Sequence, residues 1–103
     1  MKSRNITLLG STGSIGLSTL EVIDLHPDRF KVCALSANRN VDDLYAQCLA
    51  YAPAYAAMAD VASARDLRQR LHDAGSDTEV LEGDAAITRL AGDVDSEVVV
   101  AGI

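Results

Sequence analysis

The sequence has few cysteines and no long apolar run, and both absences limit what kind of protein it can be. Its two cysteines, Cys33 and Cys48, are too few and too far apart for a disulfide framework or a zinc knuckle. Uninterrupted apolar runs are only a few residues long, whereas a membrane-spanning helix needs about 20. The N-terminal segment lacks the apolar stretch and cleavage site of a secretory signal. We therefore predict a reducing, cytoplasmic location and no membrane association.

Basic residues are the minority among the charged ones. The chain has 9 Lys and Arg against 15 Asp and Glu, a net charge of −6. Residues 1–59 hold five acids and five bases, while residues 60–103 hold ten acids and four bases, so the second part carries the whole excess. No basic patch suited to a nucleic-acid backbone is present. The charge pattern predicts no nucleic-acid partner and leaves the neutral first part as the place for an anionic small ligand.

Strand-like and helix-like apolar periodicities alternate along the 103 residues, which are enough for about one domain. The expected strands are residues 5–9, 30–35, 55–58, 78–81 and 98–101, the last of them buried on both faces. The expected helices are residues 14–26, 41–52, 61–74 and 84–91. The alternation predicts an α/β fold, a Rossmann-like doubly wound parallel sheet with helices on both faces.

Two details of this layout can be tested. The first helix is expected to turn Ile15, Thr19, Val22 and Ile23 towards the core. The chain ends at Ile103, directly after the last strand, where a helix would normally follow to cover the sheet. We therefore expect residues 1–103 to be the N-terminal domain of a longer protein.

A glycine-rich loop, G-x-x-G-x-x-G, lies between the first expected strand and helix. Gly10 would close the tight turn, Gly13 would let a diphosphate approach the main chain, and Gly16 would let the helix pack on the sheet. The N–H groups of residues 12–15 and the helix dipole attract phosphate. We expect the hydroxyls of residues 11, 12 and 14 to donate to the same oxygens. The alternative is a tight turn whose glycines serve packing only, and the strand–loop–helix context favours dinucleotide binding.

The segment after the second strand indicates which dinucleotide. Enzymes that prefer NAD place an acid there, about 20 residues beyond the glycines, to hold the ribose 2′-hydroxyl. Here Asn38, Arg39 and Asn40 follow the strand, and no acid does. A guanidinium can bind a 2′-phosphate through two hydrogen bonds, and amides can donate to it. The pattern predicts NADP rather than NAD, with a solvated arginine in a polar loop as the alternative.

The remaining reactive side chains do not form a predicted site. Cys33 and Cys48 are expected to be core thiols. His26 and His72 lack a nearby nucleophile or orienting acid in the sequence. The acids at positions 93, 95 and 97 have no histidine partner and are expected in a solvated turn. We predict no catalytic and no metal-ligating residue in this chain.

Two segments resemble one enzyme family. Residues 6–16, ITLLGSTGSIG, with STL at 18–20, resemble the start of the 1-deoxy-D-xylulose 5-phosphate reductoisomerase family. Residues 34–41, ALSANRNV, resemble that family's second strand and its exit, at a fitting spacing. The resemblance implies a cytosolic or plastid homodimer of non-mevalonate isoprenoid biosynthesis. Such an enzyme rearranges 1-deoxy-D-xylulose 5-phosphate and reduces the intermediate aldehyde with NADPH, giving 2-C-methyl-D-erythritol 4-phosphate, and needs Mg or Mn.

The resemblance also implies roles for individual residues. NADPH phosphate contacts carry over to Thr12, Gly13, Ser14 and Ile15, and contacts around the 2′-phosphate carry over to Asn38, Arg39 and Asn40. Residues 101–103 are expected near the cofactor. The family's metal ligands, substrate site, lid and C-terminal domain lie beyond residue 103. The tripeptide at 95–97 resembles the family's Asp-Ser-Glu-His metal motif, but it lies in the wrong region and lacks the histidine.

These implications predict the NADPH-binding part of such an enzyme, inactive by itself. Two alternatives remain open from the residues alone. One is another NADP-dependent dehydrogenase, such as one acting on a semialdehyde, with a cysteine nucleophile further along the chain. The other is an NADP-sensing module without a catalytic domain.

Overall fold

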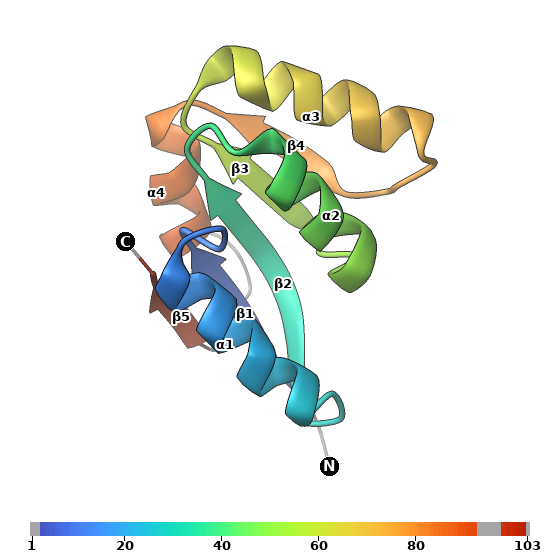
Figure 1. Ribbon diagram of the computed structural model, residues 1–103. Helices are drawn as coiled ribbons and strands as arrows, with labels where there is room; N and C mark the ends of the chain where they lie inside the picture. The colour runs from blue at the N-terminus through green and yellow to red at the C-terminus, as the bar shows by residue number, and fades with distance from the viewer. Residues whose placement is uncertain (1–2, 93–97, 103) are drawn as a thin grey trace.

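Strands and helices alternate along the chain in the computed structural model, which describes residues 3–92 and 98–102 (Figure 1). The strands are β1 (Arg4–Leu9), β2 (Phe30–Ala37), β3 (Tyr55–Met58), β4 (Glu79–Glu82) and β5 (Val98–Ala101). The helices are α1 (Ser14–Leu25), α2 (Val41–Tyr51), α3 (Val61–Asp73) and α4 (Asp84–Gly92). Every expected element is present, and no end differs from its expected position by more than two residues. None of the described helices is long and apolar enough to cross a membrane.

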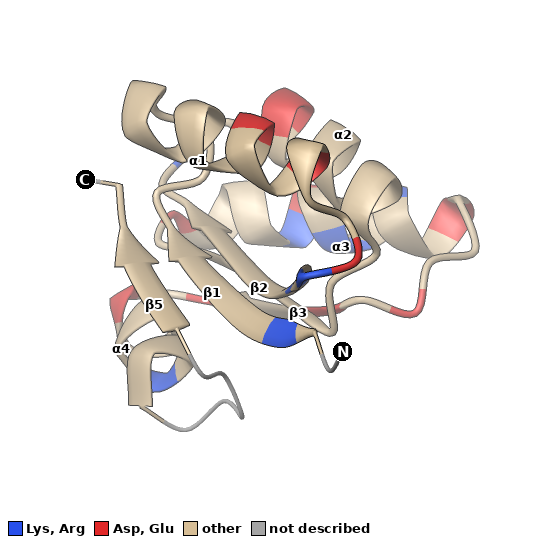
Figure 2. Ribbon diagram, turned by 90° about the horizontal axis from the view of Figure 1, so that it is seen from below, with Lys and Arg blue, Asp and Glu red and all other residues tan. Residues whose placement is uncertain are grey.

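The strands form one parallel sheet in the order β4-β3-β2-β1-β5. The chain steps in one direction from β1 to β4 and then returns past β1 to β5. Because crossovers between parallel strands are right-handed, α1, α2 and α3 cover one face and α4 covers the other (Figure 2). The predicted doubly wound fold is confirmed. The direction reverses between β1 and β5, which is where sheets of this kind bind ligands, at the carboxyl ends of the strands.

The alternation of side chains along β1 divides the core into two clusters. Ile6 and Leu8 face the three-helix layer and join the larger cluster. Leu9 faces α4, together with Ala34 and Ala57 of the neighbouring strands. These alanines are small, so Leu90 of α4 packs directly against the sheet and is fully buried. Residues of β1 are therefore fixed from both sides up to the last position before the glycine loop.

The buried face of α1 differs from the expected one. Gly16, Leu20 and Ile23 face the core, whereas Ile15 and Val22 are 55% and 52% exposed. The helix rests on Gly16, whose missing side chain lets the first turn lie directly against the strand exit. Leu20, four residues after Gly16, and Ile23, three residues after Leu20, then face the sheet. The prediction of an inward Ile15 and Val22 is wrong, that of Ile23 is right, and Thr19 is only partly buried.

Two smaller expectations also differ from the structure. β5 pairs only with β1 within the described residues, and Val99 is 43% exposed, so β5 is not buried on both faces as expected. Val98 and Val100 pack on the larger core cluster. The helix expected over residues 61–74 ends one residue earlier: Ala74 is its exposed C-cap, and Gly75 then turns the chain at φ 75°.

Candidate functional site

The turn from β1 into α1 has the two glycine requirements that the sequence predicts. Gly10 has φ 74°, in the left-handed region that favours glycine. A Cβ on Gly16 would lie 2.5 Å from the Gly10 carbonyl oxygen and 2.7 Å from Ser11 backbone atoms. No real Cβ approaches backbone so closely. Both glycines are therefore required by the protein itself, whether or not a ligand binds.

Gly13 is a different case. It is the N-cap of α1 at φ −81° and ψ 174°, an extended conformation open to any residue, and no side chain caps the helix. A Cβ there would meet only the carbonyl oxygens of Gly102 at 3.5 Å and Gly10 at 3.6 Å, which are ordinary contacts. Folding does not require a glycine at this position. Its missing side chain instead leaves the backbone around the start of α1 accessible.

The start of α1 is suited to an anion. The first N–H groups of a helix have no intrahelical acceptor, and the helix dipole makes this end positive. Ser14 and Ile15 are exposed, and Thr12 is partly buried beside them. Among the helices of the described residues, α2 has Asp42 and Asp43 in its first turn, α4 has Asp84, and α3 is capped by an aspartate, whereas α1 has no acid there. Within residues 3–92 and 98–102, α1 therefore has neither a first-turn acid nor a side-chain cap to satisfy its first N–H groups.

Ser11 does not have its expected role. It is fully buried, and its hydroxyl donates to Oε1 of Gln47 at 2.7 Å, with Ser36 O at 3.3 Å. A hydroxyl has one proton, so Ser11 does not offer it to a phosphate. The prediction of a third hydroxyl donor is wrong, because the turn directs this side chain inward.

Ser36 and Gln47 support the turn through hydrogen bonds, and neither role was predicted from the sequence. The Gly10 N–H donates to Oγ of Ser36 at 3.0 Å, and the Ser11 N–H donates to Ser36 O at 2.8 Å. Gln47 donates from Nε2 to Ser11 O at 3.0 Å. The available signal was a glutamine between Leu44 and Cys48 on the apolar face of α2, where a polar residue needs a buried partner.

The segment after β2 lies beside the glycine turn, because Ser36 bonds to both Gly10 and Ser11. Asn38, Arg39 and Asn40 are all exposed. Asn40 is the N-cap of α2: its Oδ1 accepts from the Asp43 N–H at 3.2 Å, and its Nδ2 donates to Asp43 Oδ2 at 2.8 Å. The Asn38 carbonyl accepts from the Asp60 N–H at 3.1 Å.

Arg39 is close enough to Asp60 to contribute to the pKa of that carboxyl. Hydrogen bonds from the Ser63 side chain and backbone are the main cause that lowers the pKa of Asp60, and the positive charge of Arg39 adds to them. Asp60 is therefore ionised at neutral pH and is held by the start of α3. The exposed Arg39 guanidinium and the Asp60 carboxylate, which caps α3, therefore lie near each other at the edge of the sheet where β2 and β3 end.

The β5 exit completes the surroundings of the turn. Gly102 donates its N–H to Leu9 O at 2.7 Å, and a Cβ on Gly102 would lie 3.1 Å from Gly16 N and 3.2 Å from Gly10 O. Ala101 is exposed next to it. Ile103 and the acids at positions 93, 95 and 97 lie outside the described residues. Within the described ones, no three metal-ligating side chains come together.

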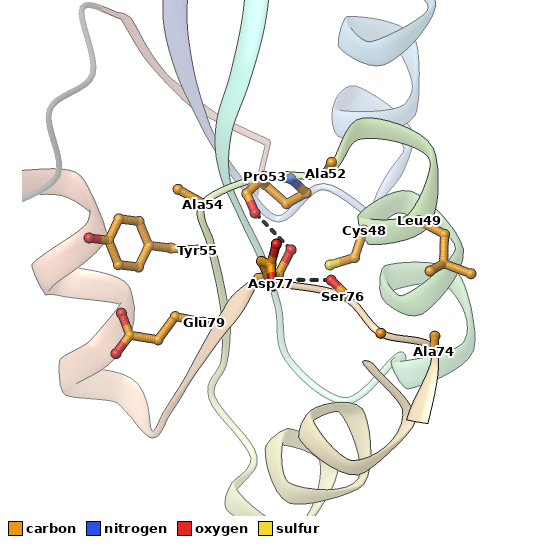
Figure 3. Close-up of a pocket in the computed structure, with 12 residues that line it drawn as sticks. Cys48, Leu49, Ala52, Pro53, Ala54, Tyr55, Ala74, Ser76, Asp77 and Glu79 are labelled. Atoms are coloured by element: carbon orange, nitrogen blue, oxygen red, sulfur yellow. Dashed lines mark hydrogen bonds between the residues drawn. The ribbon is translucent and has the colours of Figure 1, made fainter. Parts of the chain in front are cut away.

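A hollow of about 690 Å³ lies at the opposite, amino edge of the sheet (Figure 3). Its wall includes Ala52 and Ala74, which cap the C-terminal ends of α2 and α3, and the acids Asp77 and Glu79. Burial raises the pKa of the Cys48 thiol in its wall to about 12, so this cysteine remains protonated at neutral pH. None of the predicted site residues lines this hollow.

Comparison with known proteins identifies similar sequences. Residues 6–103 match the family model described as 1-deoxy-D-xylulose 5-phosphate reductoisomerase. A curated protein of that description from Nitrosomonas europaea is 48% identical over 102 residues, which are 99% of this chain and 25% of that protein. One from Aromatoleum aromaticum is 50% identical over 100 residues, 97% of this chain and 25% of the relative.

Solved structures give the same result. A crystal structure of DOX-P reductoisomerase in complex with NADPH, fosmidomycin and magnesium matches with a TM-score of 0.93 at 37% identity, over 97% of this chain and 24% of that one. The reductoisomerase from Zymomonas mobilis in complex with NADPH matches with a TM-score of 0.91 at 39% identity, over 99% and 26%. The chain thus spans about a quarter of the length of the relatives that it matches.

Proposed function

The chain belongs to the 1-deoxy-D-xylulose 5-phosphate reductoisomerase family, and we propose that it is the NADPH-binding part of an enzyme with that activity. The enzyme converts 1-deoxy-D-xylulose 5-phosphate to 2-C-methyl-D-erythritol 4-phosphate in isoprenoid biosynthesis. In this proposal it acts as a cytoplasmic homodimer. Residues 1–103 are its N-terminal domain, and the ligands of Mg or Mn and of the phosphosugar lie outside this chain.

The observation that carries the cofactor proposal is the uncapped, acid-free N-terminus of α1 beside the glycine turn. In our proposal the start of α1, at Thr12, Gly13, Ser14 and Ile15, holds the diphosphate through backbone N–H groups. The Gly13 N–H donates to Gly10 O at 3.2 Å, so Gly13 contributes access to the main chain, and its neighbours supply the donors. The hydroxyls of Thr12 and Ser14 add donors. Two similar crystal structures, by their descriptions, contain NADPH.

The segment after β2 supports the choice of NADPH over NADH. Arg39 is the exposed cation beside the glycine turn, and we assign it the 2′-phosphate. Asn38 and Asn40 flank it, and Asn40 also fixes the end of the segment because it caps α2. An aspartate or glutamate that would repel the extra phosphate is absent from residues 36–40.

These residues bind and orient, and they leave the bond changes to groups elsewhere in the protein. NADPH supplies the hydride when it is bound. The chain's part is to present the nicotinamide from a fixed turn at the carboxyl edge of the sheet. Gly10, Gly16 and Gly102 pack backbone against backbone there and help to hold the turn in place.

Cofactor titration and a turnover assay test the proposal on the full-length protein. We expect NADPH to bind at least about tenfold more tightly than NADH, since a charge-assisted hydrogen bond to the 2′-phosphate contributes about 1.5–3 kcal/mol. With 1-deoxy-D-xylulose 5-phosphate and magnesium, the protein should oxidise NADPH. Equal affinity for the two cofactors would overturn the 2′-phosphate assignment. NADPH binding without turnover of this substrate would overturn the reductoisomerase assignment and keep the cofactor site.

A further inference from the structure

Gln47 is a polar side chain inside the apolar layer between α2 and the sheet. It is 8% exposed, and its neighbours on the same helix face, Leu44 and Cys48, are 0% and 1% exposed. A buried amide costs free energy unless its donor and acceptor are both satisfied. A glutamine at this buried position is therefore explained by the hydrogen-bond partners of its side-chain amide.

Both ends of the Gln47 amide bond to the same residue, Ser11 of the glycine turn. Oε1 accepts from Ser11 Oγ at 2.7 Å, and Nε2 donates to Ser11 O at 3.0 Å, across 36 positions of sequence. The Ser11 carbonyl can only accept, so the amide can satisfy both bonds in one orientation only. Gln47 thus holds the main chain and the side chain of Ser11 together.

The turn needs such support, since two of its neighbouring positions are glycines with wide conformational freedom. Gly10 precedes Ser11 and has φ 74°, and Gly13, the N-cap of α1, follows Ser11 by two positions. Ser36 holds the other side through its bonds to the Gly10 and Ser11 N–H groups. A loop that is already ordered loses less entropy when it binds a ligand.

We propose that Gln47 is a positioning residue for the cofactor site: its clamp on Ser11 fixes the glycine turn in the shape that binds the diphosphate. This inference rests on the proposed function, because the diphosphate is the ligand that the turn would hold. Gln47 does not touch the cofactor. Since NADPH and NADH share the diphosphate, loss of the clamp should weaken both equally, unlike loss of Arg39.

The test compares Gln47→Met, which keeps the length and loses both hydrogen bonds of the clamp, with Ser11→Ala. Ser11→Ala loses one of these two bonds, together with the longer one from the Ser11 hydroxyl to Ser36 O at 3.3 Å. Leu44→Val is the matched control, since Leu44 is buried on the same helix and bonds to nothing in the turn. Dissociation constants for NADPH and NADH are measured on the full-length protein well below each variant's Tm. We expect an increase of about tenfold for Gln47→Met and about threefold for Ser11→Ala, with both cofactors affected alike. Leu44→Val should lower Tm and leave the dissociation constants within about twofold, because it changes packing only.

Two further readouts separate positioning from general stability. At saturating NADPH, Gln47→Met should keep kcat while its KM for NADPH rises. The double variant should bind no more weakly than Gln47→Met alone, because the Ser11 hydroxyl acts through the amide. Unchanged affinity in Gln47→Met, or an equal loss in Leu44→Val, would overturn the proposal.

If Gln47→Met does not fold, Ser11→Ala decides, and an unchanged dissociation constant in that variant overturns the clamp. A wild-type protein that fails to bind NADPH would instead overturn the proposed function.

Discussion

The two edges of the sheet offer opposite environments to an anion. At the carboxyl edge, the N-terminus of α1 opens beside three closely packed glycines, with no acid in its first turn. At the amino edge, the hollow of about 690 Å³ is bounded by the C-terminal ends of α2 and α3 and by Asp77 and Glu79. Helix C-termini carry a partial negative charge, and each carboxylate carries a full one. This hollow is therefore unfavourable for phosphate, and its volume alone does not make it a better candidate than the start of α1 that we propose.

The glycines of the carboxyl edge divide into those that the fold needs and one, Gly13, that the fold does not require and that we propose the ligand needs. Gly16→Ala should have the largest effect, because its Cβ would lie 2.5 Å from Gly10 O. We expect a loss of about 2–3 kcal/mol in the free energy of unfolding, from overpacking, together with loss of NADPH binding. Chemical denaturation measures it. Gly92→Ala is the control, since a Cβ there meets nothing within 4 Å. A Gly16→Ala protein as stable as the Gly92→Ala protein would contradict the assignment.

Gly13→Asp tests whether the glycine at position 13 serves ligand binding rather than folding. Aspartate is at least as good an N-cap as glycine, and the extended backbone of Gly13 accepts it, so the free energy of unfolding should stay the same or rise by a few tenths of a kcal/mol. NADPH and NADH affinities should both fall by about 2 kcal/mol or more, since the side chain would occupy the N–H groups and repel phosphate. Calorimetric titration and thermal unfolding together measure the split.

Gly13→Asn separates charge from occupancy in that experiment. It caps as well as aspartate and carries no charge, so its loss of affinity should be smaller. Equal affinity of wild type and Gly13→Asp would show that the diphosphate binds elsewhere.

Arg39→Ala tests the segment after β2. NADPH should bind about 1.5–3 kcal/mol more weakly, the contribution of a charged hydrogen bond, while NADH binding stays nearly unchanged. Arg29→Ala removes the same charge at the other end of β2 and is the control. Similar losses for the two cofactors, or for the two variants, would remove the 2′-phosphate role of Arg39.

Asp77→Asn should have the smallest effect. It removes a negative charge from the amino-edge hollow, and solvent screening over distances beyond about 10 Å leaves the carboxyl edge almost unaffected. NADPH affinity should change by less than about 0.3 kcal/mol. A gain of tenfold or more in NADPH affinity would mean that the hollow, rather than the glycine turn, takes part in cofactor binding.

The fold was predictable because periodicity, helix ends and glycine positions all agreed. Asp60 as the cap of α3 and Gly75 as its end follow from local chemistry, and the structure has both. The requirements at Gly10 and Gly16 were also predictable, since they follow from a tight turn between a strand and a helix. Local rules of this kind need no knowledge of what packs against the segment.

The structure differs from the sequence-based predictions where packing between distant segments determines which way a side chain points. Ile15 lies outward because backbone contact at Gly16 sets the rotation of α1, and apolar spacing alone does not contain that contact. Ser11 lies inward because Gln47, 36 positions away, accepts its hydroxyl. The sequence shows a serine in a glycine-rich loop of the kind that binds phosphate. Only the three-dimensional arrangement shows that this serine hydroxyl already donates its proton to Gln47 Oε1.

The most direct measurement is the crystal structure of the full-length protein with NADPH bound. The account predicts the diphosphate within about 3 Å of main-chain nitrogens at the start of α1, and the 2′-phosphate against the Arg39 guanidinium. A diphosphate bound away from Gly13, or a nucleotide lying in the hollow beside Asp77, would contradict it.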